Sequence, residues 1–283
     1  MTRSLATLIL LFFCLCISLF LQAQQSNPPF GKNKEVGKFY DIRGFKMYCE
    51  IYGEGQPLLI IHGNGGSIAD FKDQIPYFSK KYKVIIADNR AQGQSSDNGD
   101  SLSYEMMADD YAVLLSQLKI DSAYVIGWSD GGINALLLAI RHPRKVKKLA
   151  ATGANLRPDS SAVYEEVMDM VTPIYTQLKN ANPKTDQQKR NWKLVRLLAE
   201  EPHIPLSDLH KIQCPSLIIG GDHDVIKEEH TMQIYKNIPK AYLWILPNSG
   251  HSTPVVYKDD FNKVVGEFFE RPYRKIEKQG RFN

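Results

Sequence analysis

The hydrophobic pattern of the chain switches repeatedly between short apolar runs and longer amphipathic stretches. Short runs bounded by turn residues predict buried strands at residues 57–61, 83–87, 123–128, 146–152, 216–221 and 241–246. Residues 38–41 and 45–51 predict an N-terminal hairpin. Apolar residues near helical spacing predict helices at residues 67–77, 104–118, 133–140 and 255–269. Strands that alternate with helices predict an α/β fold, with a mostly parallel sheet and helices on both faces.

The alternation stops between residues 156 and 209. Helical patterns occupy residues 162–177 and 185–198, and the polar stretch between them carries no strand pattern. We therefore expect a small helical cap, inserted at about 156–209 into a single domain that spans residues 24–283.

The N-terminus has the pattern of a targeting segment. Arg3 precedes an apolar run at residues 5–21, and Ala23 offers a cleavage point before Gln24. This pattern predicts a signal peptide over residues 1–23 and a secreted or periplasmic protein. The alternative is that the segment stays uncleaved and anchors the protein in a membrane.

Composition supports one well-buried domain. The chain has 283 residues, 43% of them hydrophobic, and a net charge of +4. No internal basic stripe interleaved with aromatic residues indicates a nucleic-acid partner. Beyond the targeting segment only Cys49 and Cys214 remain, on strands expected to lie far apart, so both are expected to be free thiols.

The most informative chemical motif is a Gly-x-Ser-x-Gly pentapeptide around Ser129. A predicted strand enters it and a predicted helix leaves it, which is the setting of a nucleophile elbow. In such a turn the backbone of the serine is strained and its hydroxyl is exposed. The flanking glycines, Gly127 and Gly131, are expected because a Cβ there would collide with the neighbouring strand and helix.

A nucleophilic serine needs a base and a group that orients the base. His251 follows one predicted strand, and both Asp222 and Asp224 follow another. Each candidate lies at the carboxyl end of a strand, where open α/β sheets place their sites. The sequence therefore predicts Ser129 as nucleophile and His251 as base, with either aspartate as the orienting acid.

An oxyanion hole requires two backbone N–H groups. One is predicted from Asp130, directly after the serine, and the other from Asn64 in the loop 62–66 after an early strand. A phosphate-binding loop is the rival interpretation, but the Gly-Lys-Ser/Thr ending is absent. His62 is expected to be structural. His223 between two aspartates suggests a metal site only weakly because no second histidine stands four residues on, so neither metal nor cofactor is expected.

Together these residues resemble the α/β-hydrolase fold family of serine hydrolases, and most closely the biphenyl-hydrolase-like valacyclovir hydrolases. The segments that carry the resemblance are the elbow at residues 127–133, Thr152-Gly153-Ala154-Asn155, Trp192 and Gln213-Cys214-Pro215. The resemblance implies Asp224 as the acid, three residues after the strand-ending glycine. It also implies that Asp130 binds the amino group of an α-amino acid ester. Ala91 departs from the pattern, because related hydrolases commonly have glycine there.

The cap is expected to line the acyl pocket, with Met168, Met170, Tyr175 and Trp192 as candidates to face the substrate or, alternatively, to pack the cap on the core. Glu165 and Glu166 are expected on a solvated helix face rather than at the substrate.

The predicted function is hydrolysis of small-molecule esters through an acyl-enzyme, with α-amino acid esters or thiolactones as the substrate class. A general carboxylesterase or a hydrolase of C–C bonds is the alternative enzyme. A noncatalytic binding protein on the same scaffold is the alternative of another class. The sequence favours no particular oligomeric state.

Overall fold

The computed structural model describes residues 29–97, 99–181 and 185–275. The predicted signal segment lies outside them. In this part of the chain eight strands form one sheet in the order β1-β2-β4-β3-β5-β6-β7-β8. The strands are β1 (Lys38–Ile42), β2 (Phe45–Tyr52), β3 (Gln56–Ile61), β4 (Tyr82–Ala87), β5 (Ala123–Trp128), β6 (Val146–Thr152), β7 (Ser216–Gly221) and β8 (Ala241–Leu246).

The strands after the N-terminal hairpin are parallel. β1 and β2 pair antiparallel, β2 also pairs antiparallel with β4, and every other neighbouring pair is parallel. Central strands of such sheets are covered on both faces and read as continuous apolar runs. The run from Leu58 to Ile61 in β3 has no exposed surface, as this arrangement requires.

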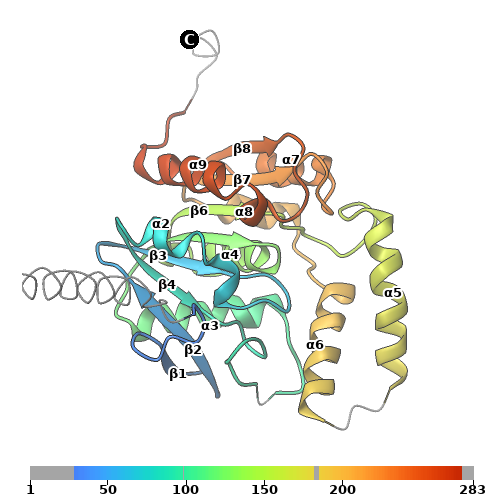
Figure 1. Ribbon diagram of the computed structural model, residues 1–283. Helices are drawn as coiled ribbons and strands as arrows, with labels where there is room; N and C mark the ends of the chain where they lie inside the picture. Colours follow the sequence, from blue (N-terminus) through green and yellow to red (C-terminus); the bar gives the residue numbers. More distant parts are fainter. Residues whose placement is uncertain (1–28, 98, 182–184, 276–283) are drawn as a thin grey trace, which may run out of the picture.

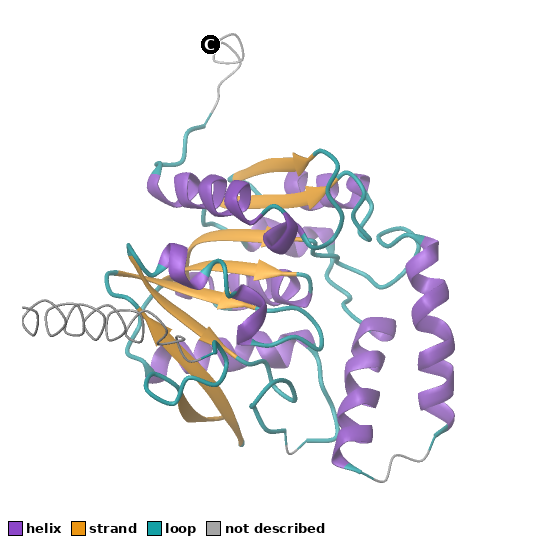
Figure 2. Cartoon of the chain, viewed as in Figure 1, coloured by secondary structure: helices purple, strands orange, loops and turns teal. Residues whose placement is uncertain are grey.

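Helices cover both faces of the sheet (Figures 1 and 2). One apolar cluster joins the sheet to α3 (Tyr104–Gln117), α4 (Asp130–Arg141) and α7 (Glu228–Asn237). A second cluster, on the other face, joins it to the 3-10 helix η1 (Ile68–Phe71), α2 (Ile75–Phe78) and α9 (Lys258–Glu270). The remaining short elements are η2 (Pro143–Lys145), which buries no residue, and η3 (Leu206–Lys211) and α8 (Thr253–Val256), which contribute buried residues. The predicted α/β fold class is confirmed.

Two predicted helices are each divided in the structure. The helix expected at 67–77 is η1 followed by α2, because Pro76 cannot donate a backbone hydrogen bond inside a helix and is accepted only in the first turn of a new one. The helix expected at 255–269 is α8 followed by α9. Tyr257 separates them with φ −110° and ψ 40°, outside the helical region.

Two helices stand between β6 and β7, beyond the carboxyl ends of the strands (Figure 1). They are α5 (Glu165–Asn180) and α6 (Asp186–Glu200), and they pack on each other. Thr185 caps α6 by accepting a hydrogen bond from the Gln188 N–H. We call this pair the cap. No described side chain of α5 is buried, whereas Lys193 and Leu197 of α6 are buried against the core.

Cys49 and Cys214 are free thiols, as predicted. Cys49 lies on β2 and Cys214 just before β7, and four strands separate β2 from β7 in the sheet. No helix among the described residues is long and apolar enough to cross a membrane.

Candidate active site

Ser129 lies on a sharp turn between β5 and α4. Its φ of 58° and ψ of −123° place a residue other than glycine in a strained region of backbone conformation. A Cβ on Gly127 would come within 2.1 Å of the Gly131 carbonyl oxygen, and one on Gly131 within 2.0 Å of the Ile61 carbonyl oxygen. The two glycines therefore allow β5, α4 and β3 to approach closely enough to form the elbow, for the reason that the sequence predicted.

Three side chains from separate loops meet at this turn. The Nε2 atom of His251 lies 2.9 Å from the Ser129 hydroxyl oxygen. The Nδ1 atom of the same ring lies 2.6 Å from Oδ1 of Asp224, which is almost fully buried. A carboxylate only accepts hydrogen bonds, so Nδ1 carries the proton and Nε2 is free to accept one from the hydroxyl.

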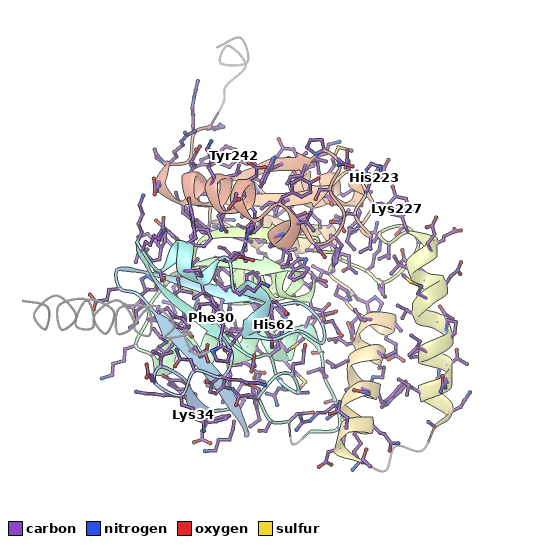
Figure 3. All side chains as sticks on the ribbon, in the orientation of Figure 1. Phe30, Lys34, His62, His223, Lys227 and Tyr242 are labelled. Atoms are coloured by element: carbon purple, nitrogen blue, oxygen red, sulfur yellow. The ribbon has the colours of Figure 1, made fainter. Side chains whose placement is uncertain are left out.

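The competing carboxylate, Asp222, does not contact the imidazole of His251 but hydrogen-bonds within the neighbouring loops. Its Oδ1 accepts hydrogen bonds from the Ser249 N–H at 3.0 Å and from Nδ1 of His223 at 2.9 Å. The hydrogen bond from His223, followed by backbone hydrogen bonds, lowers the pKa of Asp222 to about 2. His223 is labelled in Figure 3, and its side chain is 76% exposed. Asp222 thus fastens the turn before His251, and Asp224 contacts the imidazole.

The loop 62–66 passes beside the nucleophile. A Cβ on Gly63 would lie 3.1 Å from the Ser129 Cβ, so this glycine permits the close approach. His62 (Figure 3) is fully buried, and burial lowers its pKa. Its Nε2 accepts the Asn89 N–H at 2.9 Å, and its Nδ1 lies 2.8 Å from the Gly63 carbonyl oxygen. These contacts make His62 a neutral ring that holds the loop in place.

Asp130 places its carboxylate in the interior beside the nucleophile. The residue is 2% exposed. Its Oδ2 accepts a hydrogen bond from Nδ2 of Asn64 at 2.9 Å, and the Tyr104 hydroxyl donates a second. Burial raises the pKa of Asp130 to about 6, although the Asn64 and Tyr104 hydrogen bonds act in the opposite direction. The carboxylate is therefore mostly charged at neutral pH and retains free acceptor positions.

A cavity of about 560 Å³ opens onto Ser129 and His251. Its walls come from the core loops, including Asn64 and Asp130, and from the apolar side of the cap. The cap residues that line it are Val167, Met168, Val171, Thr172, Tyr175, Leu198, Ala199 and Glu200. Four carboxylates line the cavity, those of Asp70, Asp130, Glu200 and Glu201, whereas no lysine or arginine does. The cavity wall is therefore acidic, and His251 is its one basic group among the described residues.

The structure separates the cap candidates. Met168 and Tyr175 line the cavity. Met170 does neither of the two things expected of the candidates, since it is 63% exposed on the outer side of α5. Trp192 takes the packing alternative: its ring lies against the Tyr175 ring with 5.6 Å between centroids and lines no part of this cavity. Glu165 and Glu166 stay away from the cavity, as expected.

Three residues of the site were not predicted from the sequence. Tyr104 opens α3 and donates to Asp130. Trp128 donates its indole N–H to the His251 carbonyl oxygen at 2.8 Å. Glu201 lines the cavity just after α6, and burial raises its pKa. Within residues 29–97, 99–181 and 185–275, no group of three or more histidine, cysteine, aspartate or glutamate side chains is arranged to hold a metal ion.

Comparison with known proteins places the chain among hydrolases. The sequence pattern of the α/β hydrolase fold family matches residues 56–191. Serine hydrolase BPHL of Homo sapiens is 28% identical over 246 residues, which cover 81% of this chain and 84% of that protein. The 2-hydroxymuconate semialdehyde hydrolase of Pseudomonas sp. (strain CF600) is 33% identical over 208 residues, which cover 72% of this chain and 67% of that protein.

A solved structure shares the fold at lower identity. The enol-lactonase from Burkholderia xenovorans LB400 superposes with a TM-score of 0.67 at 20% identity. The match covers 83% of this chain and 100% of the lactonase.

Proposed function

The chain belongs to the α/β hydrolase fold family and is a hydrolase, and from this premise we propose that it cleaves small esters or thiolactones of α-amino acids through an acyl-enzyme on Ser129. One observation supports Ser129 as the nucleophile: its hydroxyl contacts Nε2 of His251, whose Nδ1 contacts Asp224. This is the arrangement that activates a serine hydroxyl.

In the proposed first half-reaction, Oγ of Ser129 attacks the carbonyl carbon of the ester and its proton passes to Nε2 of His251. The backbone N–H groups of Asn64 and Asp130 stabilise the oxyanion. The tetrahedral intermediate then expels the alcohol or thiol, which takes the proton from His251. In the second half-reaction, water attacks the acyl carbon as it loses a proton to His251, and the second tetrahedral intermediate expels Oγ of Ser129, which takes that proton back from His251 as the acid leaves. Asp224 keeps the ring oriented throughout and stabilises the imidazolium.

The acidity of the cavity supports a cationic substrate. Asp130 adjoins the nucleophile, and three further carboxylates line the cavity, whereas no lysine or arginine does. Of the three, Glu200 is paired with Arg196 at 3.5 Å outside the lining. A buried carboxylate is stabilised by a charged donor, and the ammonium group of an α-amino acid ester can supply one. Glu201 has no hydrogen bond or ion pair from its carboxylate among the described contacts, so it adds negative charge to the same wall.

The alternative of C–C bond hydrolysis is less compatible with this wall. The relative that is 33% identical is named for a muconate, a carboxylate-bearing compound. A carboxylate substrate would meet like charges on this wall, with Asp130 beside the nucleophile, and no lysine or arginine among the lining residues. Like charges in a poorly solvated cavity repel each other.

The test compares phenylalanine ethyl ester with its N-acetyl derivative, in which the α-nitrogen is a larger, uncharged amide. The free amine is expected to have the higher kcat/KM, by about thirty- to a thousandfold, which corresponds to about 2–4 kcal/mol for a desolvated charge pair. Asp130→Asn retains the backbone N–H and the side-chain shape, so it should remove most of that preference without harming the N-acetyl ester. Equal kcat/KM values for the two esters in the wild-type enzyme would contradict the amino acid substrate class.

A further inference from the structure

The side chain of Asn64 joins three parts of the molecule. Its Nδ2 donates to Oδ2 of Asp130 at 2.9 Å and to the Leu194 carbonyl oxygen of α6 at 3.3 Å. Both partners can only accept hydrogen bonds, so the amide nitrogen must face them and the orientation of the carboxamide is fixed. One side chain thus connects the loop 62–66, the residue after the nucleophile, and the cap.

The contact with α6 is made where the cap is fastened to the core. Lys193, one residue before Leu194, is 8% exposed, and its ammonium group contacts the Asp97 carboxylate and the Gly99 carbonyl oxygen. Leu197, one turn on, is 1% exposed and belongs to the main apolar cluster. The first turn of α5 is also attached, since Val167 and Met168 pack against the small cluster of Ala162, Val163 and Ile226, but only α6 buries side chains of its own. A displacement of α6 would move the Leu194 carbonyl.

The peptide group between Gly63 and Asn64 is held from its other end as well. The Gly63 carbonyl oxygen accepts hydrogen bonds from Nδ1 of His62 at 2.8 Å and from the Gly66 N–H at 3.2 Å. Nδ1 is the donor because Nε2 of the ring accepts the Asn89 N–H. In a planar trans peptide the N–H points opposite to the carbonyl, so these bonds also set the direction of the Asn64 N–H.

We propose that the Asn64 carboxamide is a positioning group that couples the seating of α6 to the geometry of the oxyanion hole. With α6 seated, the carboxamide is held between Asp130 and the Leu194 carbonyl, and the Asn64 backbone N–H is directed at the oxyanion. With α6 displaced, one of the two anchors of the carboxamide is lost and the N–H is less well aligned. This inference rests on the proposed use of the Asn64 N–H as an oxyanion donor, but not on the charge of the substrate.

The first experiment uses Asn64→Ala, which retains the backbone N–H. With p-nitrophenyl acetate, an uncharged substrate, kcat should fall by about ten- to a hundredfold, the scale of a misplaced catalytic donor. KM should change less than about threefold, because ground-state binding does not depend on the oxyanion. The matched control is Asn191→Ala on the exposed side of α6, where the asparagine contacts Gln187 and not the core; it should leave kcat unchanged.

A second variant keeps the test valid if the alanine variant folds poorly. Asn64→Asp has nearly the same shape, but the new carboxyl can donate to Asp130 only when it is protonated. Its kcat relative to wild type should therefore rise as the pH falls toward 5. The other titratable groups at this position are Asp130, Tyr104 and His251, and the charge of the new carboxyl acts on them, so Asn64→Gln, which adds no titratable group, is measured over the same pH range as the reference. A ratio that stays constant with pH would contradict the positioning role.

Coupling to the cap is tested by loosening α6 with the double replacement Asp97→Asn/Lys193→Met, which removes both charges and leaves neither unpaired. This replacement should lower kcat by about tenfold in the wild-type background and by less than about twofold in Asn64→Ala, because the two changes break the same connection. Independent, multiplying effects would overturn the inference. If Asn64→Ala turns over normally while Ser129→Ala is inactive, the positioning role of Asn64 is wrong but the proposed function stands. If Ser129→Ala turns over normally, the proposed function itself is wrong.

Discussion

Helices α4 and α5 line the same cavity but differ in how deeply their side chains are buried. Ten of the 12 residues of α4 are buried, and its first residue follows the nucleophile directly. None of the 16 residues of α5 is buried, and this helix packs on α6. Both face the same cavity, α4 with Asp130 and α5 with apolar side chains such as Val171.

This difference in burial separates the groups that would carry out the reaction from those that would select the substrate. The groups that would break the ester are held by close packing of β5, α4 and the strand ends, where a single added methyl group would collide. The cap side chains that would meet the acyl group are half exposed and can change at little cost in stability. We therefore expect substitutions in the core to change the rate or the stability, and those in α5 to change the preference for substrate.

The largest expected effect lies on the core side, at the reacting groups. Ser129→Ala or His251→Ala should lower kcat by up to about a millionfold, because the triad members act as a unit. Asp224→Asn should cost about three to four decades. Asp222→Asn is the matched control and should cost less than about tenfold, because Asp222 contacts the loop and not the imidazole. Steady-state kinetics with an ester substrate measures all four, and a larger loss for Asp222→Asn than for Asp224→Asn would refute the assignment of the acid.

Two truncations of aliphatic side chains compare the helices directly. Leu136→Ala in α4 removes a side chain with no exposed surface and should lower the free energy of unfolding by about 2–5 kcal/mol. Val171→Ala in α5 should lower it by less than about 0.5 kcal/mol and should instead change KM for esters with bulky acyl groups. Urea unfolding and a short substrate series give both quantities. Similar losses of stability in the two variants would remove the distinction between core and cap.

Asp130 is the point where stability and function oppose each other in α4. Its pKa of about 6 in the folded state lies above the usual 3.8, because burial disfavours the charged form. Ionisation therefore costs stability, fully above about pH 6 and not at all below about pH 4. Asp130→Asn should stabilise the fold by about 1–3 kcal/mol at pH 7, and the gain should vanish toward pH 4. Urea unfolding at a series of pH values measures this, and a gain that is independent of pH would show that the buried charge is not its cause.

The smallest effect is expected at Ala91. This residue has φ 64°, the left-handed conformation that glycine adopts without strain. Ala91→Gly relieves about 1–2 kcal/mol of strain but gives up a buried methyl group and increases the entropy of the unfolded chain. The net change in the free energy of unfolding should stay within about 1 kcal/mol. A loss above about 2 kcal/mol in thermal or urea unfolding would show that the methyl group, rather than the backbone strain, dominates at this position.

The same contrast explains what could be predicted from the sequence. The elbow has local signals, since a strand, three glycines and a helix all lie within residues 123–141. The ends of β7 and β8 could also be predicted from the sequence, and they bring Asp224 and His251 to the same edge of the sheet. Ala91 adopts the backbone conformation of the glycine that the resemblance led us to expect there.

The missed contacts depend on pairs far apart in the chain. The hydrogen bond from Asn64 to Leu194 joins residues 130 positions apart. No local pattern reveals that Tyr104, at the start of a helix, donates to Asp130. In the cap the helical periodicity was clear, but which side faces the cavity depends on how α5 and α6 pack. For that reason the sequence could name Met168, Met170, Tyr175 and Trp192 as candidates but not tell which of them line the cavity.

The most direct test of the central claim is intact-protein and peptide mass spectrometry after exposure to a fluorophosphonate, which forms a stable adduct with an activated serine. The account predicts one adduct per chain, on the peptide that contains Ser129, with labelling abolished in Ser129→Ala and strongly slowed in His251→Ala. Labelling that persists in Ser129→Ala, or no labelling of the folded wild-type protein, would contradict a serine nucleophile at the elbow.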